Sequence, residues 1–221
     1  MIDFVSVAEF ERRTGIRITK KHTGKMKGKR SLSTSVIANP ICKQRMLNGD
    51  SICAKCYAAK MLGGVYKREE ACFGRNFEAL QKPLEVVPIF PKGWTDFRFE
   101  SFGDIASETQ FHNYLLIARA NPKTTFAIWS KNIPIMDRVF QFESKPKNLI
   151  IIQSSTKINE IDEPRYWFVD KVFTVYKDRE TAKKLGVKIN CEAKATHKRC
   201  EDCNKCYNLR NKTKYINEIL K

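Results

Sequence analysis

The sequence predicts an α/β protein, specifically a partial, six-stranded parallel β/α barrel of the TIM-barrel-like kind, with a C-terminal cysteine-rich extension. From residue 93 onward, short β-branched or aromatic runs alternate with amphipathic helical segments, as in βα units with a parallel sheet. The run 148–154 (NLIIIQS) is a continuous apolar run, which is typical of a strand covered on both faces. Six strands are too few for a closed eight-stranded barrel, and a doubly wound sheet would give the same pattern.

Local signals along the chain place the individual elements. The first strand is β-branched and is expected to end at Asn39-Pro40, Pro83 stops the second helix, and Gly186 closes the last one. Strands are expected at 33–38, 97–100, 124–130, 148–154, 172–176 and 187–190. Helices are expected at 7–13, 66–80, 108–120, 133–142 and 179–185.

These elements divide the chain into three regions: a basic N-terminal segment (1–30), the partial barrel with a cysteine-bearing loop (31–190), and the cysteine-rich, cluster-binding extension (191–221). No stretch approaches the roughly 20 apolar residues that span a bilayer. The N-terminus also lacks the charged and apolar pattern of a secretory signal. We therefore expect a cytoplasmic protein with no membrane partner.

The charge balance is strongly basic. The chain has 41 Lys and Arg against 24 Asp and Glu, which gives a formal net charge of +17. A field of this sign attracts nucleic acid or other anionic ligands at long range, although a Lys-rich solvated surface would give the same composition. The densest run extends from Arg17 to Arg30, where Gly24 and Gly28 favour a mobile basic loop.

Four of the eight cysteines form a C-terminal group. Disulfides are rare in a reducing cytoplasm, so this many cysteines call for another explanation. Three of the group lie on two-residue spacings, which are typical of loops that hold a [4Fe–4S] cluster. The ligands would be Cys191, Cys200, Cys203 and Cys206. A tetrahedral zinc site that uses Cys191 or His197 is the alternative metal.

The N-terminal cysteine group is Cys42, Cys53 and Cys56, in the loop between the first strand and the next helix. Ligands of parallel α/β proteins bind at that end of the sheet. Three cysteine ligands would leave one cluster iron open to a substrate or cofactor. Cys72 could be the fourth ligand, but its position between two apolar residues favours a place in the core. The two groups could also share one site, so one or two clusters are expected.

Polar residues at the carboxyl end of strand 97–100 supply weak candidates for catalysis. Glu100 and Asp104 could face the same pocket as the N-terminal cysteines. Asp104 could instead form a turn or cap the following helix.

The order of these parts is similar to the partial barrel of radical S-adenosylmethionine enzymes that carry an auxiliary cluster. Two departures argue against S-adenosylmethionine as a cofactor: ten residues separate Cys42 from Cys53 where that family has three, and Phe102-Gly103-Asp104 replaces a Gly-Gly-Glu-like stretch. Several strings more specifically resemble a phage-encoded family, the gene product 88 domain. They are TGKM (23–26), CAKCYA (53–58), RNFE (75–78), FRF (97–99), SFGD (101–104), IARANP (117–122) and CNKCYNL (203–209).

The resemblance implies a phage protein of the host cytoplasm, with no settled activity to carry over. Together, residues and resemblance predict an iron–sulfur protein, and a redox or radical enzyme of unknown substrate with a host redox partner. The alternative is a nucleic-acid-binding protein without catalysis, in which zinc or an iron–sulfur cluster only cross-links the loops.

Overall fold

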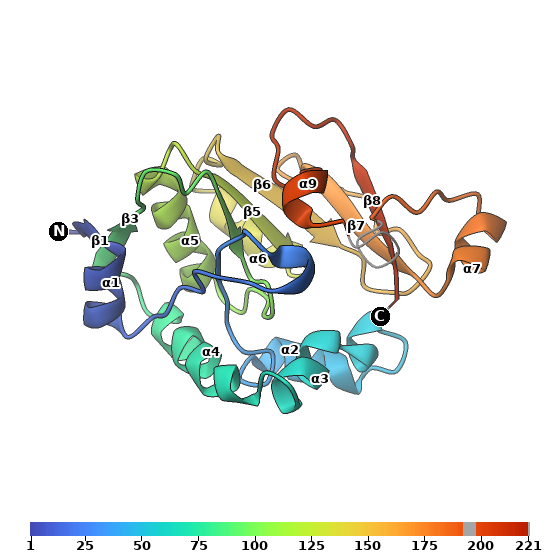
Figure 1. Cartoon of the computed structure of the whole chain (residues 1–221), viewed down its shortest axis with the longest axis horizontal. Helices are drawn as coiled ribbons and strands as arrows, with labels where there is room; N and C mark the ends of the chain where they lie inside the picture. The colour runs from blue at the N-terminus through green and yellow to red at the C-terminus, as the bar shows by residue number, and fades with distance from the viewer. Residues whose placement is uncertain (192–197, 221) are drawn as a thin grey trace.

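A six-stranded parallel sheet forms the centre of the molecule (Figure 1), in a computed structural model that describes residues 1–191 and 198–220. The strand order is β2-β4-β5-β6-β7-β8, and all neighbours are parallel. The strands are β2 (Ser31–Leu32), β4 (Asp96–Phe99), β5 (Thr125–Ser130), β6 (Leu149–Ser154), β7 (Lys171–Tyr176) and β8 (Tyr215–Ile219). The predicted α/β class and the parallel six-stranded sheet are therefore confirmed. The sheet is open, and β2 and β8 are its edges.

A second, two-stranded parallel sheet pairs β1 (Asp3–Ser6) with β3 (Val86–Ile89). The α-helices are α1 (Val7–Thr14), α2 (Pro40–Leu47), α3 (Tyr57–Gly63), α4 (Lys67–Leu80), α5 (Glu108–Ala120), α6 (Ile133–Phe140), α7 (Arg179–Lys184) and α9 (Cys200–Cys203). Two 3₁₀ turns, η1 (Gly24–Met26) and η2 (Ile52–Lys55), complete the described elements. In that part of the chain, no helix is long and apolar enough to cross a bilayer.

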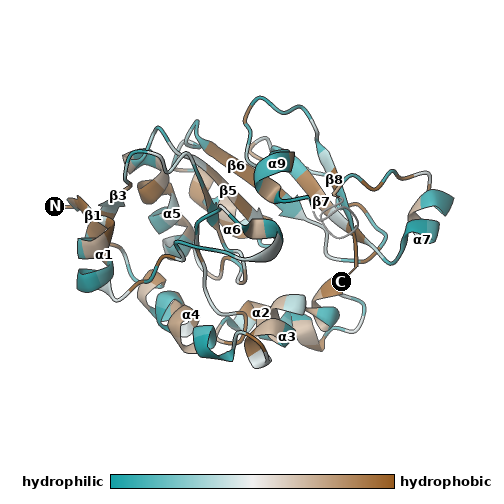
Figure 2. Cartoon of the chain, viewed as in Figure 1, coloured by the Kyte–Doolittle hydropathy of each residue, from teal (hydrophilic) through white to brown (hydrophobic). Residues whose placement is uncertain are grey.

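The two faces of the large sheet have different coverings. Alternate strand residues, among them Phe99 and Ile128, pack with helix residues such as Tyr114 in the main core, under α5 and α6. The residues between them, such as Ile150 and Trp129, pack against the C-terminal cysteine segment. Figure 2 shows β5 and β6 as strongly hydrophobic strands, whereas α7 is mostly hydrophilic. We call the first surface the outer face and the second the inner face.

The prediction of a strand at 33–38 is wrong. Only Ser31 and Leu32 pair with β4, and the chain then turns into α2. Asn39 is the N-cap of that helix: its Oδ1 accepts hydrogen bonds from the backbone N–H groups of Ile41 (2.9 Å) and Cys42 (3.2 Å). Pro40 is the first helical residue, where its missing N–H costs nothing. The Asn-Pro pair therefore begins a helix and does not end a strand.

The last strand also differs from the prediction. The segment 187–190 is not a strand, and the sixth strand is Tyr215–Ile219, which pairs in parallel with β7. The backbone N–H groups of Asn190 and Cys191 both donate to the carbonyl of Asn217, at 3.2 and 2.9 Å, so the chain only touches β8 there. The sheet therefore extends into the C-terminal region beyond residue 190.

The basic run between residues 17 and 30 is held against the fold at several points, although a mobile loop was expected. Three of its lysines form ion pairs, Lys20 with Glu11 (2.8 Å), Lys25 with Glu218 (2.8 Å) and Lys29 with Asp96 (2.9 Å). Met26 in η1 is buried. This segment therefore covers part of the inner face of the sheet.

Candidate functional site

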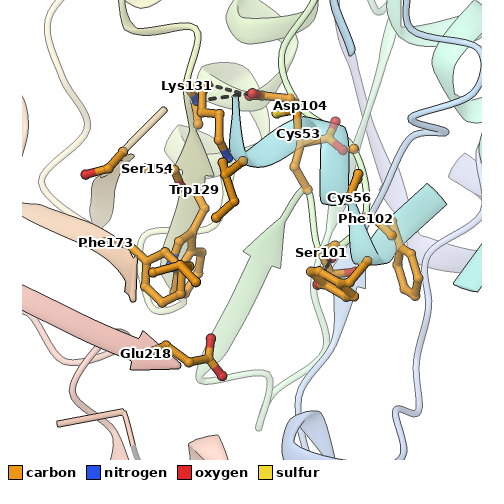
Figure 3. Close-up of a pocket in the computed structure, with 18 of the residues that line it drawn as sticks. Cys53, Cys56, Ser101, Phe102, Asp104, Trp129, Lys131, Ser154, Phe173 and Glu218 are labelled. Atoms are coloured by element: carbon orange, nitrogen blue, oxygen red, sulfur yellow. Dashed lines mark hydrogen bonds between the residues drawn. The ribbon is translucent and has the colours of Figure 1, made fainter. Parts of the chain in front are cut away.

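A cavity of about 220 Å³ lies at the inner face of the sheet and at the carboxyl ends of β4, β5 and β6. Six of the eight cysteines line it, although they come from opposite ends of the chain. They are Cys42, Cys53 and Cys56 of the N-terminal group and Cys191, Cys200 and Cys206 of the C-terminal group. Figure 3 shows Cys53 and Cys56 on one wall, opposite Trp129 and Phe173.

Capping residues fix the N-terminal group on this wall. Asn39 caps the helix that carries Cys42, and its Nδ2 donates to the carbonyl of Asp104 at 2.8 Å. The Ser51 hydroxyl accepts from the Cys53 backbone N–H at 3.1 Å, and the backbone N–H of Ile52 donates to the carbonyl of Thr156 at 2.9 Å. These contacts tie the cysteine loop to the ends of two strands.

The thiol of Cys42 is buried and electrostatically coupled to the rest of this wall. Burial raises its pKa most, and the charges of Asp104, Cys53, Glu100 and Cys56 raise it further. Such a thiol stays protonated unless a cation stabilises the thiolate.

The C-terminal group lies on a tight turn over the inner face. The backbone N–H of Asn204 donates to the carbonyl of Cys200 at 2.9 Å, and Asn204 has a left-handed φ of 49°. A smaller cavity of about 60 Å³ is lined by Cys191, Cys200, Cys203 and Cys206. Burial raises the pKa of Cys206 to about 12, and the charges of the other three cysteines raise it as well.

The donor chemistry of the C-terminal group fits a metal cofactor, because four cysteine sulfurs are the donor set of structural zinc sites and of [4Fe–4S] clusters. However, no three His, Cys, Asp or Glu side chains of the described residues are arranged to hold a metal ion. Ligation would therefore require the thiols to draw together. His197, the alternative zinc ligand, lies outside the described residues.

Cys72 does not line either cavity. It is half-buried and packs beside the group of apolar side chains that contains Cys42 and Cys56. Burial raises the pKa of Cys72 most, and the charges of Arg75 and Arg17 lower it. This differs from Cys42, where the neighbouring charges raise the pKa further. Cys72 is therefore half-buried outside both cavities, where a place in the core was expected.

Glu100 lines the cavity and is buried directly after β4, with a left-handed φ of 54°. Its carboxylate accepts hydrogen bonds from the Thr34 backbone N–H (3.0 Å), the Gln110 amide (2.7 Å) and the Tyr114 hydroxyl. Burial raises its pKa to about 7, against the opposing effect of the bonds from Tyr114 and Thr34. With these donors in place, Glu100 fixes the loop at residues 33–35 against β4 and α5.

Gly103 lies within this packing. A Cβ atom there would overlap the Thr34 hydroxyl and the Glu100 carboxylate. No other residue type fits without a shift of the loop at 33–35.

Asp104 also lines the cavity and joins the ends of two strands. Its carboxylate accepts from the Ser130 hydroxyl (2.5 Å), the Lys131 backbone N–H (3.1 Å) and Arg45 (3.5 Å). Figure 3 shows Asp104 beside Lys131 above the cavity. The N-cap of α5 is Ser107, so Asp104 does not cap that helix. The structure thus places both acids in the cysteine-lined cavity, as predicted.

Three further lining residues are not among the predicted site residues: Arg98, Trp129 and Tyr207. The guanidinium carbon of Arg98 lies 4.0 Å from the centre of the Trp129 ring, and Tyr207 packs 5.6 Å from the same ring. The signal for Arg98 was its alternation with Phe97 and Phe99, which places it on the inner face.

The fold and the cavity define an α/β protein whose open parallel sheet carries a cysteine-lined pocket on one face. The chain belongs to the gene product 88 family, whose model matches residues 16–212. That range includes all eight cysteines. No curated protein and no solved structure matches the chain. The resemblance to radical S-adenosylmethionine enzymes has no support from these comparisons.

Proposed function

We propose that this protein binds an iron–sulfur cluster through its C-terminal cysteines and acts in redox chemistry on a ligand in the adjoining cavity. The observation that carries the proposal is the convergence of both cysteine groups on one cavity. Segments more than 130 residues apart in the sequence supply its thiols. Thiol groups that converge in this way are typical of a metal cofactor beside a pocket.

The C-terminal group is the better candidate for the ligands. Cys191, Cys200, Cys203 and Cys206 share the small cavity, and the spacing of the last three suits a cubane. When bound, a [4Fe–4S] cluster supplies one-electron transfer. Zinc on the same four thiols is the alternative metal, and it would give the site a structural role only.

The N-terminal group would either hold a second cluster or form the reactive wall of the pocket. Cys42, Cys53 and Cys56 provide three thiols, which would leave one position open toward the cavity. The covering of the outer face by α5 and α6 supports the partial β/α barrel, because it leaves the inner face as the interior.

A nucleic-acid-binding role has less support. Three lysines of the densest basic run are engaged by acidic side chains of the same chain, and two of them are largely buried. Their charge is therefore partly neutralised before any nucleic acid could bind.

Iron and acid-labile sulfide analysis of anaerobically purified protein tests the proposal. The wild type should be brown and contain about four irons per cluster. Cys203→Ala should lose the C-terminal cluster, because Cys203 lines only the smaller cavity, and Cys53→Ala should report on the N-terminal group alone. Cys72→Ala is the matched control and should retain all the iron. A colourless protein with stoichiometric zinc would exclude the cluster.

A further inference from the structure

Arg98 presents a half-buried positive charge to the cavity. Its guanidinium lies over the Trp129 ring at 4.0 Å, and its Nη1 is 3.8 Å from the Met26 sulfur. Its Nε is buried and has no hydrogen-bond partner among the described residues. In the same part of the chain, no carboxylate forms an ion pair with this arginine.

The acids around Arg98 are engaged elsewhere. Along β4, the carboxylate two residues earlier, Asp96, pairs through Oδ2 with Lys29 at 2.9 Å, while its Oδ1 has no partner among the described residues. The carboxylate two residues later, Glu100, accepts from three side chains and a backbone N–H. Across the cavity, Glu218 pairs with Lys25 at 2.8 Å. Asp104 accepts from two backbone N–H groups, a serine and Arg45.

A cation that is partly withdrawn from water and has no anionic partner is costly, because the Coulomb attraction that offsets desolvation is missing. Desolvation lowers the pKa of Arg98 most, and no carboxylate is among the neighbouring groups that raise it, of which Tyr207 is the first. The remaining cost is therefore one that an incoming anion would remove.

Four further cations line the same cavity, and two of them, Lys25 and Arg45, are paired with Glu218 and Asp104. Neither the Lys55 nor the Lys131 ammonium forms an ion pair within the described residues. Figure 3 shows Lys131 at the end of the cavity away from Glu218. Phe102, Phe173 and Trp129 add apolar and aromatic surface. At about 30 Å³ per water, a cavity of about 220 Å³ has room for roughly seven waters, which suits a small organic molecule.

We propose that the cavity binds a small organic anion, whose carboxylate or phosphate group pairs with Arg98 and whose apolar part packs on Trp129 and Phe173. A planar, two-pronged guanidinium favours these anions over halides, because it donates to two oxygens at once. A small organic anion is thus the class of ligand that we infer for the pocket of the proposed function. The inference rests on that function only in treating this anion as the substrate of the redox chemistry. Binding itself needs no cluster.

Isothermal titration of the purified full-length protein tests the inference with four probes. Benzoate and phenyl phosphate carry both features, inorganic phosphate carries only the charge, and benzyl alcohol only the ring. We expect benzoate or phenyl phosphate to bind at least tenfold more tightly than the last two probes. Which of the first two binds better distinguishes a carboxylate ligand from a phosphate.

Three variants locate the binding. Arg98→Met should lower the affinity for the anion at least tenfold, and Arg98→Lys should retain part of the affinity because the charge remains. Arg138→Met, which removes the same charge from an exposed pair with Glu108, is the matched control and should bind as the wild type does. If Arg98→Met does not fold, Arg98→Lys alone must still lower the affinity for the anion more than Arg138→Met does.

Two results would overturn the inference: no binding of either aromatic anion to the wild type at millimolar concentration, or equal binding to the Arg98 variants. Loss of iron from Arg98→Met without anion binding to the wild type would also overturn it, and would assign Arg98 to the charge balance of the cysteine site. Anion binding by a protein that contains no iron would support this inference while removing the proposed cluster.

Discussion

The two cysteine groups face one cavity but are built differently. The N-terminal group stands on short capped elements, where Asn39 and Ser51 orient Cys42 and Cys53. The C-terminal group curls on a turn with a left-handed Asn204, and its four thiols share a small cavity of their own. The first group is therefore held in place by caps on the wall of the large cavity, whereas the second gathers four thiols around a smaller cavity, where a metal could bind only if the thiols drew closer together.

The largest effect should come from Cys206→Ser. This thiol is coupled to the other three cysteines of its group and packs at the inner face. Loss of a bound cofactor should lower the free energy of unfolding by about 3 kcal/mol or more, or about 6–12 °C in Tm. Calorimetry with iron analysis measures both effects. Cys53→Ser is the comparison in the other group and should cost about 1 kcal/mol or less; equal losses would contradict the distinction.

Gly103→Ala should destabilise only the packing that supports the N-terminal cysteine group. The added Cβ would overlap Thr34 and Glu100, which hold the loop that leads into α2, so we expect a loss of about 2 kcal/mol in unfolding free energy. The iron content due to the C-terminal group should stay unchanged. Gly49→Ala, where a Cβ would meet nothing within 4 Å, is the matched control. A stable Gly103→Ala protein would show that this wall is not fixed by that contact.

A pH dependence should follow from Glu100 on the same side. Its pKa is about 7 in the folded protein, above its ordinary value of 4.5, because burial disfavours the charged form. The folded state therefore holds the proton more tightly, and the carboxyl makes the free energy of unfolding fall as the pH rises from about 4.5 to about 7, by up to about 3 kcal/mol.

Denaturant unfolding of the wild type and of Glu100→Gln across this pH window measures that contribution. The amide cannot accept every bond that Glu100 accepts, so the variant should be less stable by an offset, but it should lack this part of the pH slope. Glu108→Gln, on the exposed surface, should keep the wild-type slope. Identical slopes in the wild type and Glu100→Gln would contradict the assignment.

The smallest effect should come from Cys72→Ala. This cysteine lines neither cavity and is only half-buried, so its loss should cost less than about 1 kcal/mol and leave the iron content unchanged. A drop in iron to the level of Cys53→Ala would make Cys72 a fourth ligand of the N-terminal group.

Much of the fold could be predicted from local patterns. The strands at β4 to β7 and the long helices α4 and α5 were found, because their periodicity reflects one buried face. The Asn39-Pro40 pair was misread, since the same two residues can end a strand or begin a helix. The last strand was misplaced because two short β-branched runs flank the cysteines, and only pairing with β7 selects 215–219.

The site was less accessible from the sequence. The spacing of Cys200, Cys203 and Cys206 marked one group, and Glu100 and Asp104 were placed correctly by their position after a strand. The meeting of both cysteine groups depends on packing between distant parts of the chain. The significance of Arg98 depends on where the acids of β4 and β8 direct their hydrogen bonds, which no local pattern encodes.

Electron paramagnetic resonance of the anaerobically purified, dithionite-reduced protein tests the central claim most directly. We predict the signal of a reduced [4Fe–4S] cluster in the wild type, its persistence in Cys53→Ser and its loss in Cys206→Ser. A signal that survives in Cys206→Ser, or a wild type without iron, would contradict the assignment of the cluster to the C-terminal cysteines.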